Sequence, residues 1–276
     1  MVNTNTIIIE ALREDRAWQD ITANTLFSSK IKAKAEMLCK QDGVICGLDI
    51  VKSTFKKLDK NSRVNVLVKD GQFVKKGKRI AVITASARSI LSAERTALNF
   101  IQHLSGIATL TKKFANKLKG TKIKLLDTRK TIPGMRELEK YAVRCGGGAN
   151  HRLNLNDMAL IKDNHLKIDN DIKRNVSMIK AKYPKVKIEV ECENLAQVKQ
   201  AVESRADIIM LDNMSVSNIN KASKLIRASG SKIEIEVSGG VNLQNISRYA
   251  RLDIDRISIG ALTHSVSALD ISLEII

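Results

Sequence analysis

The sequence of 276 residues predicts an α/β fold, namely an incomplete α/β (TIM-like) barrel with an α+β N-terminal domain. Two observations predict it. From Ile123 onward, short apolar runs alternate with amphipathic segments of helical period, which is typical of βα units that build a parallel sheet. Before about residue 105, apolar residues alternate in period two around one helical segment, which is typical of an α+β domain.

Six apolar runs define the strands of the expected barrel. They occupy residues 122–126, 158–161, 187–190, 207–211, 233–237 and 256–259. Amphipathic helices are expected between them, among others at residues 135–145, 194–204 and 213–228. Six units over roughly 150 residues fall short of the eight strands and about 250 residues of a complete barrel. The barrel is therefore expected to be incomplete.

The first 105 residues contain the elements of the α+β domain. Strands are expected at residues 30–40 and within 62–87, with Asp70 and Gly71 as a hairpin-type turn, and a helix at 48–59. A long helical stretch from Ser89 to about residue 118 links the two parts. Gly106 is the expected break in that helix, because glycine interrupts helical segments.

The charge of the chain raises the question of nucleic acid, since the formal net charge is +18. Residues 1–104 carry 18 Lys and Arg against 10 Asp and Glu, and the remainder carries 29 against 19, so the excess is evenly spread. Aromatic residues, which stack on bases in many nucleic-acid proteins, make up only 3% of the chain. An anionic small substrate or a Lys-rich surface explains the charge better than a nucleic-acid partner.

The cysteines and the N-terminus indicate a cytoplasmic protein. Cys39, Cys46, Cys145 and Cys192 form no CxxC pair and have no histidine at metal-ligand spacing, so neither a zinc site nor a disulfide framework is expected. The N-terminus lacks a basic region before an apolar one, and no segment has about 18 consecutive apolar residues. We therefore expect no membrane partner.

Polar residues that follow the predicted strands define the expected site, since the carboxyl ends of barrel strands meet at one edge. The early strand ends and the segment after them are cationic, with Arg129, Lys130, His151, Arg152 and Lys162. The middle ends are acidic, with Glu191 and Asp212, and the last are the Gly- and Ser-rich turns at 238–240 and 260–265. This order suits polyanionic substrates with a divalent metal between carboxylates and phosphates, and Mg²⁺ is the expected cofactor.

Several of these features also have a structural interpretation. The CGGG run at 145–148 is equally well explained as a helix C-cap. His103 is expected to be a packed or surface residue of the long helix rather than a catalyst. Glu189, Glu191 and Glu193 share one face of a strand, so at least one of them is expected to have a partner such as a metal or a lysine.

Seven segments of the chain resemble the quinolinate phosphoribosyltransferase family. They are ERTALNFIQHLSGIAT (94–109), LLDTRKTIPGMRELEKYAVRCGGGANHR (125–152), LIKDNH (160–165), IEVECEN (188–194), DIIMLDN (207–213), EVSGGV (236–241) and ISIGALTHSVSALDIS (257–272). The resemblance extends over essentially the whole chain; Gln19 stands where the family usually has glycine. It implies an N-terminal domain at 1–105, rejoined by about 266–276, and a catalytic partial barrel at 106–265.

The resemblance also implies an activity and a set of site residues. Quinolinate and 5-phosphoribosyl 1-pyrophosphate (PRPP) would give nicotinate mononucleotide, pyrophosphate and CO2 in de novo NAD biosynthesis. Arg129, His151, Arg152, Lys162 and, from a partner chain, Arg95 would bind quinolinate. Lys130 and Lys162 would serve PRPP, and Glu191 and Asp212 would bind Mg²⁺ and the ribose. The 5′-phosphate region and the remaining substrate contacts would involve Ser238, Gly239, Gly240, Ser258, Gly260 and His264.

The resemblance further implies a homodimer, or a hexamer of dimers, with shared active sites. Two alternatives stay open at this point. One is a related type II phosphoribosyltransferase of the molybdenum-operon kind, which shares much of the DTRKT region. The other is a basic nucleic-acid-binding protein, which would need a continuous basic stripe that the order of the strand ends does not provide.

Overall fold

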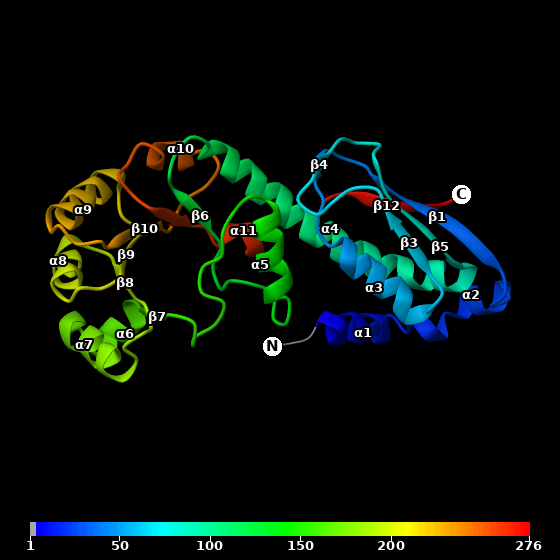
Figure 1. Cartoon of the computed structure of the whole chain (residues 1–276), viewed down its shortest axis with the longest axis horizontal. Helices are drawn as coiled ribbons and strands as arrows, with labels where there is room; N and C mark the ends of the chain where they lie inside the picture. The colour runs from blue at the N-terminus through cyan, green and yellow to red at the C-terminus, as the bar shows by residue number, and fades with distance from the viewer. Residues whose placement is uncertain (1–3) are drawn as a thin grey trace. The chain divides into compact units, whose positions relative to one another are not determined.

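The computed structural model describes residues 4–276, and the chain divides into two compact units (Figure 1). Unit 1 comprises Met1–Lys112, Thr131–Gly147 and Leu262–Ile276, and unit 2 comprises Lys113–Lys130 and Gly148–Ala261. These units differ from the domains expected at 1–105 and 106–265, because residues 106–112 and 131–147 make their contacts within unit 1. In the part that the structure describes, no helix is both long and apolar enough to cross a membrane.

Unit 1 is built on a four-stranded antiparallel sheet in the order β12-β1-β5-β3. Its strands are β1 (Lys32–Cys39), β3 (Arg63–Val66), β5 (Arg79–Ser86) and β12 (Ile271–Ile275). A separate short ladder joins β2 (Gly43–Val44) and β4 (Phe73–Val74). Because β12 pairs with β1 from Ala35 opposite Ile275 to Cys39 opposite Ile271, the C-terminal strand forms an edge of this N-terminal sheet.

Helices supply the other half of the unit 1 core. They are α1 (Thr4–Glu14), the 3-10 turn η1 (Ala17–Gln19), α2 (Ile21–Leu26), α3 (Leu48–Leu58), α4 (Ala87–Lys117), α5 (Arg136–Cys145) and α11 (Ala261–His264). In β1 every second side chain is buried, and these side chains pack with apolar residues of α3 and α4 that recur at three- and four-residue spacing. Figure 1 shows α3 and α4 running along the sheet.

Asp70 and Gly71 do not form the hairpin turn that the sequence predicted. They lie between β3 and β4, which belong to different sheets, although Gly71 does have the left-handed φ of 84° that turn chemistry favours. The Asp70 carboxylate instead accepts hydrogen bonds from the backbone N–H groups of Gly47 (3.1 Å to each oxygen) and Leu48 (3.2 Å) at the start of α3. The prediction was wrong because an Asp carboxylate can equally well accept hydrogen bonds from the unpaired backbone N–H groups at the start of a helix that is distant in the sequence.

Gly106 does not break the long helix, since α4 is continuous from Ala87 to Lys117. A Cβ at residue 106 would lie 2.4 Å from the carbonyl oxygen of Ser267 and 3.0 Å from Val266. The glycine is therefore required for a close approach of another backbone segment. Gly146, the C-cap of α5, has the same role, since a Cβ there would lie 2.5 Å from the carbonyl oxygen of Ala108. Gly147 follows the cap with the left-handed φ of 90° that is common after a helix end.

Unit 2 is built on a six-stranded, all-parallel sheet in the order β6-β11-β10-β9-β8-β7. The strands are β6 (Lys124–Leu126), β7 (Ala159–Ile161), β8 (Ile188–Cys192), β9 (Ile208–Asp212), β10 (Glu234–Ser238) and β11 (Arg256–Ser258). All six lie where the sequence predicted strands. Since β6 and β7 are the two edges and no ladder joins them within residues 4–276, the barrel is incomplete, as predicted.

Helices cover one face of this sheet, and α7, α8 and α9 form a continuous layer beside β8 and β9 (Figure 1). The helices of unit 2 are α6 (Asp163–Ile168), α7 (Ile172–Lys182), α8 (Leu195–Glu203), α9 (Val216–Ala228) and α10 (Ile246–Tyr249). Asn194 and Ser215 cap α8 and α9 through their side-chain oxygens, which fixes the start of each helix just after its strand. The short strand-to-helix connections place polar residues at one edge of the sheet.

Candidate active site

A polar pocket of about 540 Å³ lies at the carboxyl ends of the unit 2 strands. All of its lining residues belong to unit 2. Nine of them are residues that the sequence predicted for the site: Arg129, Lys130, His151, Arg152, Lys162, Glu191, Asp212, Ser238 and Ser258. The others are Thr128, Leu160, Asp163, Glu193, Met210 and Asn213. The pocket therefore brings the cationic and the acidic strand ends together.

Two arginines form the cationic side of the pocket. Burial, followed by the positive charge of Arg129, lowers the pKa of the Arg152 guanidinium, although the negative charge of Glu189 partly opposes this effect. Arg152 Nη1 also donates to the carbonyl oxygen of Met158 at 3.0 Å, which holds the side chain in place. Two guanidinium groups that repel one another in a partly buried site are well suited to bind a planar carboxylate.

Lys162 and Lys130 add flexible positive charge at the same edge. Lys162 has extended backbone angles and is the residue before α6, where its N–H donates to Nδ1 of His165 at 3.2 Å. Its Nζ lies 3.8 Å from Asp163 Oδ1, and the side chain is 44% exposed. Lys130 is exposed and follows a turn in which its N–H donates to the Thr128 hydroxyl at 3.1 Å. Both ammonium groups have room to reach a ligand.

Glu191 and Asp212 form the acidic side, on the neighbouring strands β8 and β9. Burial, followed by the negative charge of Asp212, raises the pKa of the Glu191 carboxyl. Asp212 Oδ2 accepts a hydrogen bond from Asn213 Nδ2 at 2.7 Å, and its backbone lies opposite Ser238 on β10. Two carboxylates that repel one another in one pocket provide the hard oxygen donors that a divalent cation prefers.

The Ser238–Gly239–Gly240 turn closes the end of β10. Gly239 and Gly240 both have positive φ angles, 84° and 65°. A Cβ at Gly239 would lie 2.2 Å from Oδ1 of Asn213, whereas a Cβ at Gly240 would meet nothing within 4 Å. Asn213, itself at φ 52°, donates its N–H to Ser238 O at 3.1 Å. The turn and Asn213 therefore pack closely against each other and together form one corner of the pocket.

His151 lies at the base of the pocket and is nearly buried, with a side-chain exposure of 6%. Its Nε2 lies 3.0 Å from Glu189 and 3.4 Å from Glu236, two carboxylates that are fully buried. Burial opposes charge on the imidazole, but the two carboxylates outweigh it and raise the pKa of His151 to about 9. In the neutral imidazole, Nδ1 accepts the N–H of Arg152 at 2.8 Å, so the ring proton of that tautomer is on Nε2 and faces the carboxylates.

Glu189 has a partner, as the sequence predicted for the acids of β8, and among the side chains of the described residues this partner is the imidazole of His151. Burial and the charge of Glu236 raise the pKa of Glu189 to about 7. Arg256 completes the group, since its Nη1 lies 3.7 Å from Glu236 and its Nη2 pairs with Glu234. These partners come from the segment after α5 and from β10 and β11, so the pattern within β8 alone does not identify them.

The segment that carries His151 is anchored by Asp127, which is fully buried at the end of β6. Its carboxylate accepts the Asn150 side-chain N–H₂ at 2.5 Å and the His151 N–H at 2.8 Å. Ala149 forms an isolated bridge with Leu126 of the same strand. In the sequence, Asp127 is simply the first residue after a predicted strand, and only its contacts with the segment 149–151 show that it is an anchor.

The remaining predicted residues do not line this pocket. Gly239 and Gly240 directly follow its lining residue Ser238, and Gly260 follows β11. His264 belongs to unit 1, where its Nδ1 lies 2.6 Å from the Ser265 hydroxyl. Arg95 also belongs to unit 1.

Arg95 lies on α4 and lines a separate pocket of about 390 Å³ together with Glu14, Asp15 and His103. His103 is a packed helix residue, as expected, because its Nε2 contacts the buried Glu139 at 2.8 Å. Within a single chain, Arg95 therefore belongs to a group of side chains in unit 1.

The fold and the pocket together define a class of protein, an incomplete α/β barrel with a polar pocket, rich in cationic side chains, at the carboxyl ends of its strands. Comparison with known proteins is more specific. The N-terminal domain family of quinolinate phosphoribosyl transferase matches residues 20–105, and the C-terminal domain family matches residues 107–274.

Relatives match nearly the whole chain. A probable nicotinate-nucleotide pyrophosphorylase [carboxylating] of Methanocaldococcus jannaschii is 41% identical, with 98% of this chain and 96% of the relative covered. The nicotinate-nucleotide pyrophosphorylase [carboxylating] of Mycobacterium leprae is 39% identical, with 97% and 95% covered. A solved structure of the nicotinate-nucleotide pyrophosphorylase from Francisella tularensis superposes with a TM-score of 0.92 at 42% identity, covering 99% of this chain and 96% of that one. The chain belongs to the quinolinate phosphoribosyltransferase family.

Proposed function

We propose that the polar pocket of unit 2 is the active site in which this chain carries out the reaction of its family. The chain is a decarboxylating phosphoribosyltransferase of NAD biosynthesis. Quinolinate and PRPP give nicotinate mononucleotide, pyrophosphate and CO2. The observation that carries the assignment to this pocket is that one cavity holds both a pair of arginines and a pair of carboxylates. The first pair suits a dicarboxylate, and the second suits a metal-bound phosphate ester.

Quinolinate has two adjacent carboxylates, and the cationic side of the pocket offers it Arg129, Arg152 and Lys162. A guanidinium binds a carboxylate through two parallel hydrogen bonds, whereas an ammonium acts as a point charge. His151 contributes from the base of the pocket, where the Glu189 and Glu236 carboxylates and the Arg152 N–H fix its ring. This proposal is supported by the mutual repulsion of Arg129 and Arg152, which a bound dianion would relieve.

The phosphoribosyl pyrophosphate is proposed to lie over the other half of the pocket. Lys130 would contact its phosphates, and Lys162 lies in the same pocket, within range of either substrate. The 5′-phosphate region is proposed to involve the corner formed by Ser238, Gly239 and Gly240, together with Ser258 and Gly260; His264 is assigned to it by family resemblance alone. Turns with positive φ expose backbone N–H groups that can bind phosphate oxygens.

Mg²⁺ is proposed to bind at Glu191 and Asp212. These carboxylates fit the ion, because they share one polar pocket and the negative charge of Asp212 disfavours that of Glu191. When bound, the ion neutralises the leaving pyrophosphate. The chain's own carboxylates also stabilise the positive charge that develops at the anomeric carbon as that group departs.

The arginines orient the second substrate for attack. They hold quinolinate so that its ring nitrogen meets the anomeric carbon, and the nitrogen becomes a fixed cation once it is alkylated. Loss of CO2 from the neighbouring carbon then leaves a carbanion that this cation stabilises, and a proton completes the product. No organic cofactor is needed for these steps.

The direct test incubates the purified chain with quinolinate, PRPP and Mg²⁺ and measures nicotinate mononucleotide and released CO2. EDTA should abolish turnover and added Mg²⁺ should restore it, because the two carboxylates are themselves negative and need the cation between them and the leaving pyrophosphate. Product without CO2 release would contradict the proposed reaction. Full activity in EDTA would contradict the metal site while leaving the transferase activity intact.

A homodimer, or a hexamer of dimers, is proposed to complete each site with Arg95 from the neighbouring chain. The support is the family resemblance of the segment that contains Arg95 and the position of this residue in unit 1, away from the pocket lining. Cytoplasmic location is likewise a proposal, supported by four cysteines that are all free thiols.

Mixing two inactive variants tests the shared site. Arg95→Ala and Arg129→Ala should each be nearly inactive, and subunit exchange between them should restore roughly a quarter of the wild-type sites, since one site of each mixed dimer carries neither change. Wild-type chains taken through the same exchange are the control. If they survive and the mixture stays inactive, Arg95 does not act across an interface.

A further inference from the structure

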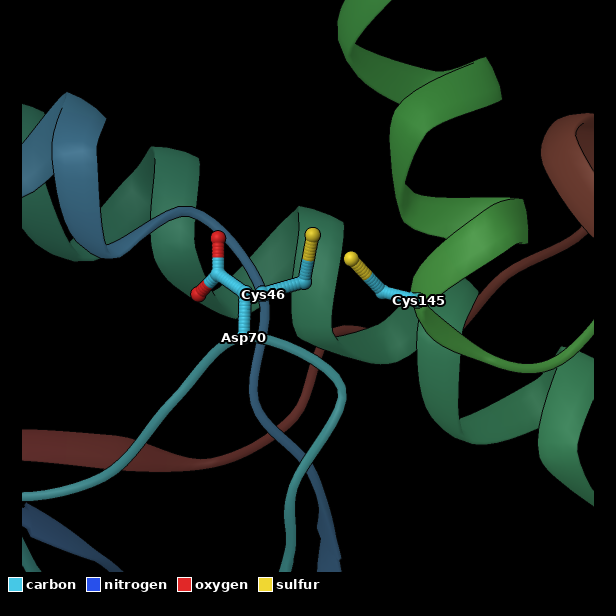
Figure 2. Close-up of side chains that lie close together, drawn as sticks. All are labelled: Cys46, Asp70 and Cys145. Carbon is cyan, nitrogen blue, oxygen red and sulfur yellow. The ribbon is translucent and has the colours of Figure 1, made fainter.

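Three side chains from distant parts of the sequence meet in unit 1, outside the proposed active site (Figure 2). They are Cys46, which precedes the start of α3, Asp70, in the loop after β3, and Cys145, the last residue of α5. One terminal atom of each lies within 4.8 Å of the others. Figure 2 shows the sulfur atoms of Cys46 and Cys145 pointing toward one another. Nothing in the proposed reaction uses this cluster.

Asp70 is already fully engaged within the cluster. One of its oxygens accepts the N–H groups of Gly47 and Leu48, and the other accepts Gly47 N–H and the Tyr141 hydroxyl, at 3.0–3.2 Å. A carboxylate has about four acceptor positions, so these bonds occupy them. Metal coordination by Asp70 would break contacts that hold the start of α3. The chemistry left to the cluster is that of its two thiols.

The two thiols are unequal. Cys46 is fully buried, whereas Cys145 is partly exposed. The facing thiol of Cys46 lowers the pKa of Cys145, and the Tyr141 hydroxyl lowers it further against the effects of burial and the charge of Asp70; Arg144 also favours the thiolate. The pKa of Cys46 is raised, first by its interaction with Cys145 and then by burial. A partly exposed thiol with a lowered pKa that faces a buried thiol is the arrangement of an attacking and a resolving cysteine.

We propose that Cys46 and Cys145 are a modification site, at which a hydroperoxide converts the two thiols into a reversible disulfide. The Cys145 thiolate attacks one peroxide oxygen and the O–O bond breaks, giving a sulfenic acid and, after uptake of a proton, water or an alcohol. Cys46 loses its proton and attacks the Cys145 sulfur, which forms the S–S bond and releases water. In sum, two thiols are oxidised by two electrons and the peroxide is reduced by two.

The other two cysteines provide an internal contrast. Cys39 and Cys192 are buried, and their thiols contact backbone carbonyl oxygens, of Gln41 at 3.1 Å and of Val190 at 3.9 Å. Burial raises the pKa of both, to about 12 for Cys192. Neither belongs to the cluster that the structure forms around Asp70. The peroxide should therefore select the Cys46–Cys145 pair.

The experiment treats the full chain with hydrogen peroxide below the thiol concentration and maps its peptides without reduction. We expect a Cys46–Cys145 cross-link that appears before any oxidation of Cys39 or Cys192 and disappears on addition of a dithiol reductant. Oxidation of Cys145 to sulfinic acid without the cross-link would overturn the proposal. Oxidation of Cys39 or Cys192 at the same rate would overturn it too.

Variants separate the two roles. Cys46→Ser should stop at a Cys145 sulfenic acid that a dimedone-type probe traps, and Cys145→Ser should leave Cys46 unoxidised. Tyr141→Phe, which removes the hydroxyl that interacts with both Asp70 and Cys145, should slow formation of the disulfide by about five- to tenfold. Cys39→Ser is the matched control and should cross-link at the wild-type rate. If Cys46→Ser fails to fold, the Cys145→Ser and Tyr141→Phe results decide, and wild-type rates in Tyr141→Phe would contradict the assigned thiolate.

Discussion

Glu189 and Glu191 lie two residues apart on the same face of β8, yet their surroundings are opposite. Glu189 is fully buried against His151 and Glu236, whereas Glu191 lines the polar pocket. The same difference separates Glu236 from Ser238 on β10. One step of two residues along a strand thus moves a side chain from the interior to the binding edge.

The difference shows what each depth in the barrel requires of a charged group. A carboxylate in the interior cannot reach water, so it needs permanent partners, which here are His151 and Arg256. A carboxylate at the strand ends keeps lone pairs for a ligand. Interior acids should therefore act on stability, and acids at the edge should act on turnover.

The largest effect is expected from breaking the interior group. Glu236→Gln would leave His151 and Arg256 with less negative charge and should lower the free energy of unfolding by about 3–5 kcal/mol. Denaturant unfolding measures this change. The exposed Glu193→Gln is the control and should change the free energy of unfolding by less than about 0.5 kcal/mol. If Glu236→Gln were as stable as the wild type, the proposed difference between buried acids and acids at the strand ends would be contradicted.

The edge acids should show the complementary result. Asp212→Asn and Glu191→Gln should lower kcat by about 100- to 1,000-fold, because each removes charge that acts on the transition state. Their unfolding midpoints should stay close to that of the wild type, since relief of carboxylate repulsion offsets any lost contact. Steady-state kinetics together with thermal unfolding test this. Equal losses of stability at Glu191 and Glu236 would show that depth does not separate their roles.

The cationic half of the edge is expected to determine substrate choice. Nicotinate lacks the second carboxylate of quinolinate and would leave an arginine or lysine of the pocket without its counter-charge, which costs about 1–3 kcal/mol. The ratio kcat/KM should therefore favour quinolinate by about 10- to 200-fold. Competition between the two acids in one reaction measures this ratio. A ratio near one would contradict the assignment of Arg129 and Arg152 to the dicarboxylate.

The smallest effect concerns the turn at the end of β10. Gly240→Ala should cost about 1 kcal/mol, for the positive φ alone. Gly239→Ala should cost about 1–3 kcal/mol more, because its Cβ would overlap Asn213. Unfolding of the two variants side by side separates strain from overlap. Equal losses of unfolding free energy in the two variants would mean that Asn213 moves aside at little cost.

Much of the fold could be predicted because its signals are local. The six parallel strands and the helices α8 and α9 follow from apolar periodicity within short segments. The incomplete barrel followed from counting those strands, and the predicted family is confirmed by matches over nearly the whole chain. Nine predicted site residues line one pocket because strand ends of a parallel sheet converge. Their individual roles, the metal and the dimer stay predictions.

What failed depended on distant contacts. Gly106 was expected to break a helix, but its role is to let Ser267 approach. Asp70 was expected in a hairpin, but its carboxylate satisfies backbone N–H groups at the start of α3. In both cases the residue type correctly indicated a special backbone environment. The kind of environment depends on a partner from another segment of the chain, which the local sequence does not show.

The sequence by itself determined the order of strands and helices, the family and the chemical types of the strand-end residues, because these depend on the spacing of neighbours along the chain. Only the tertiary structure decided that Glu189 is a buried partner of His151 while Glu191 faces the pocket, and that Cys46 meets Cys145. The physical reason is that burial and pairing depend on which distant segments pack together, and side-chain periodicity along one strand carries no information about them.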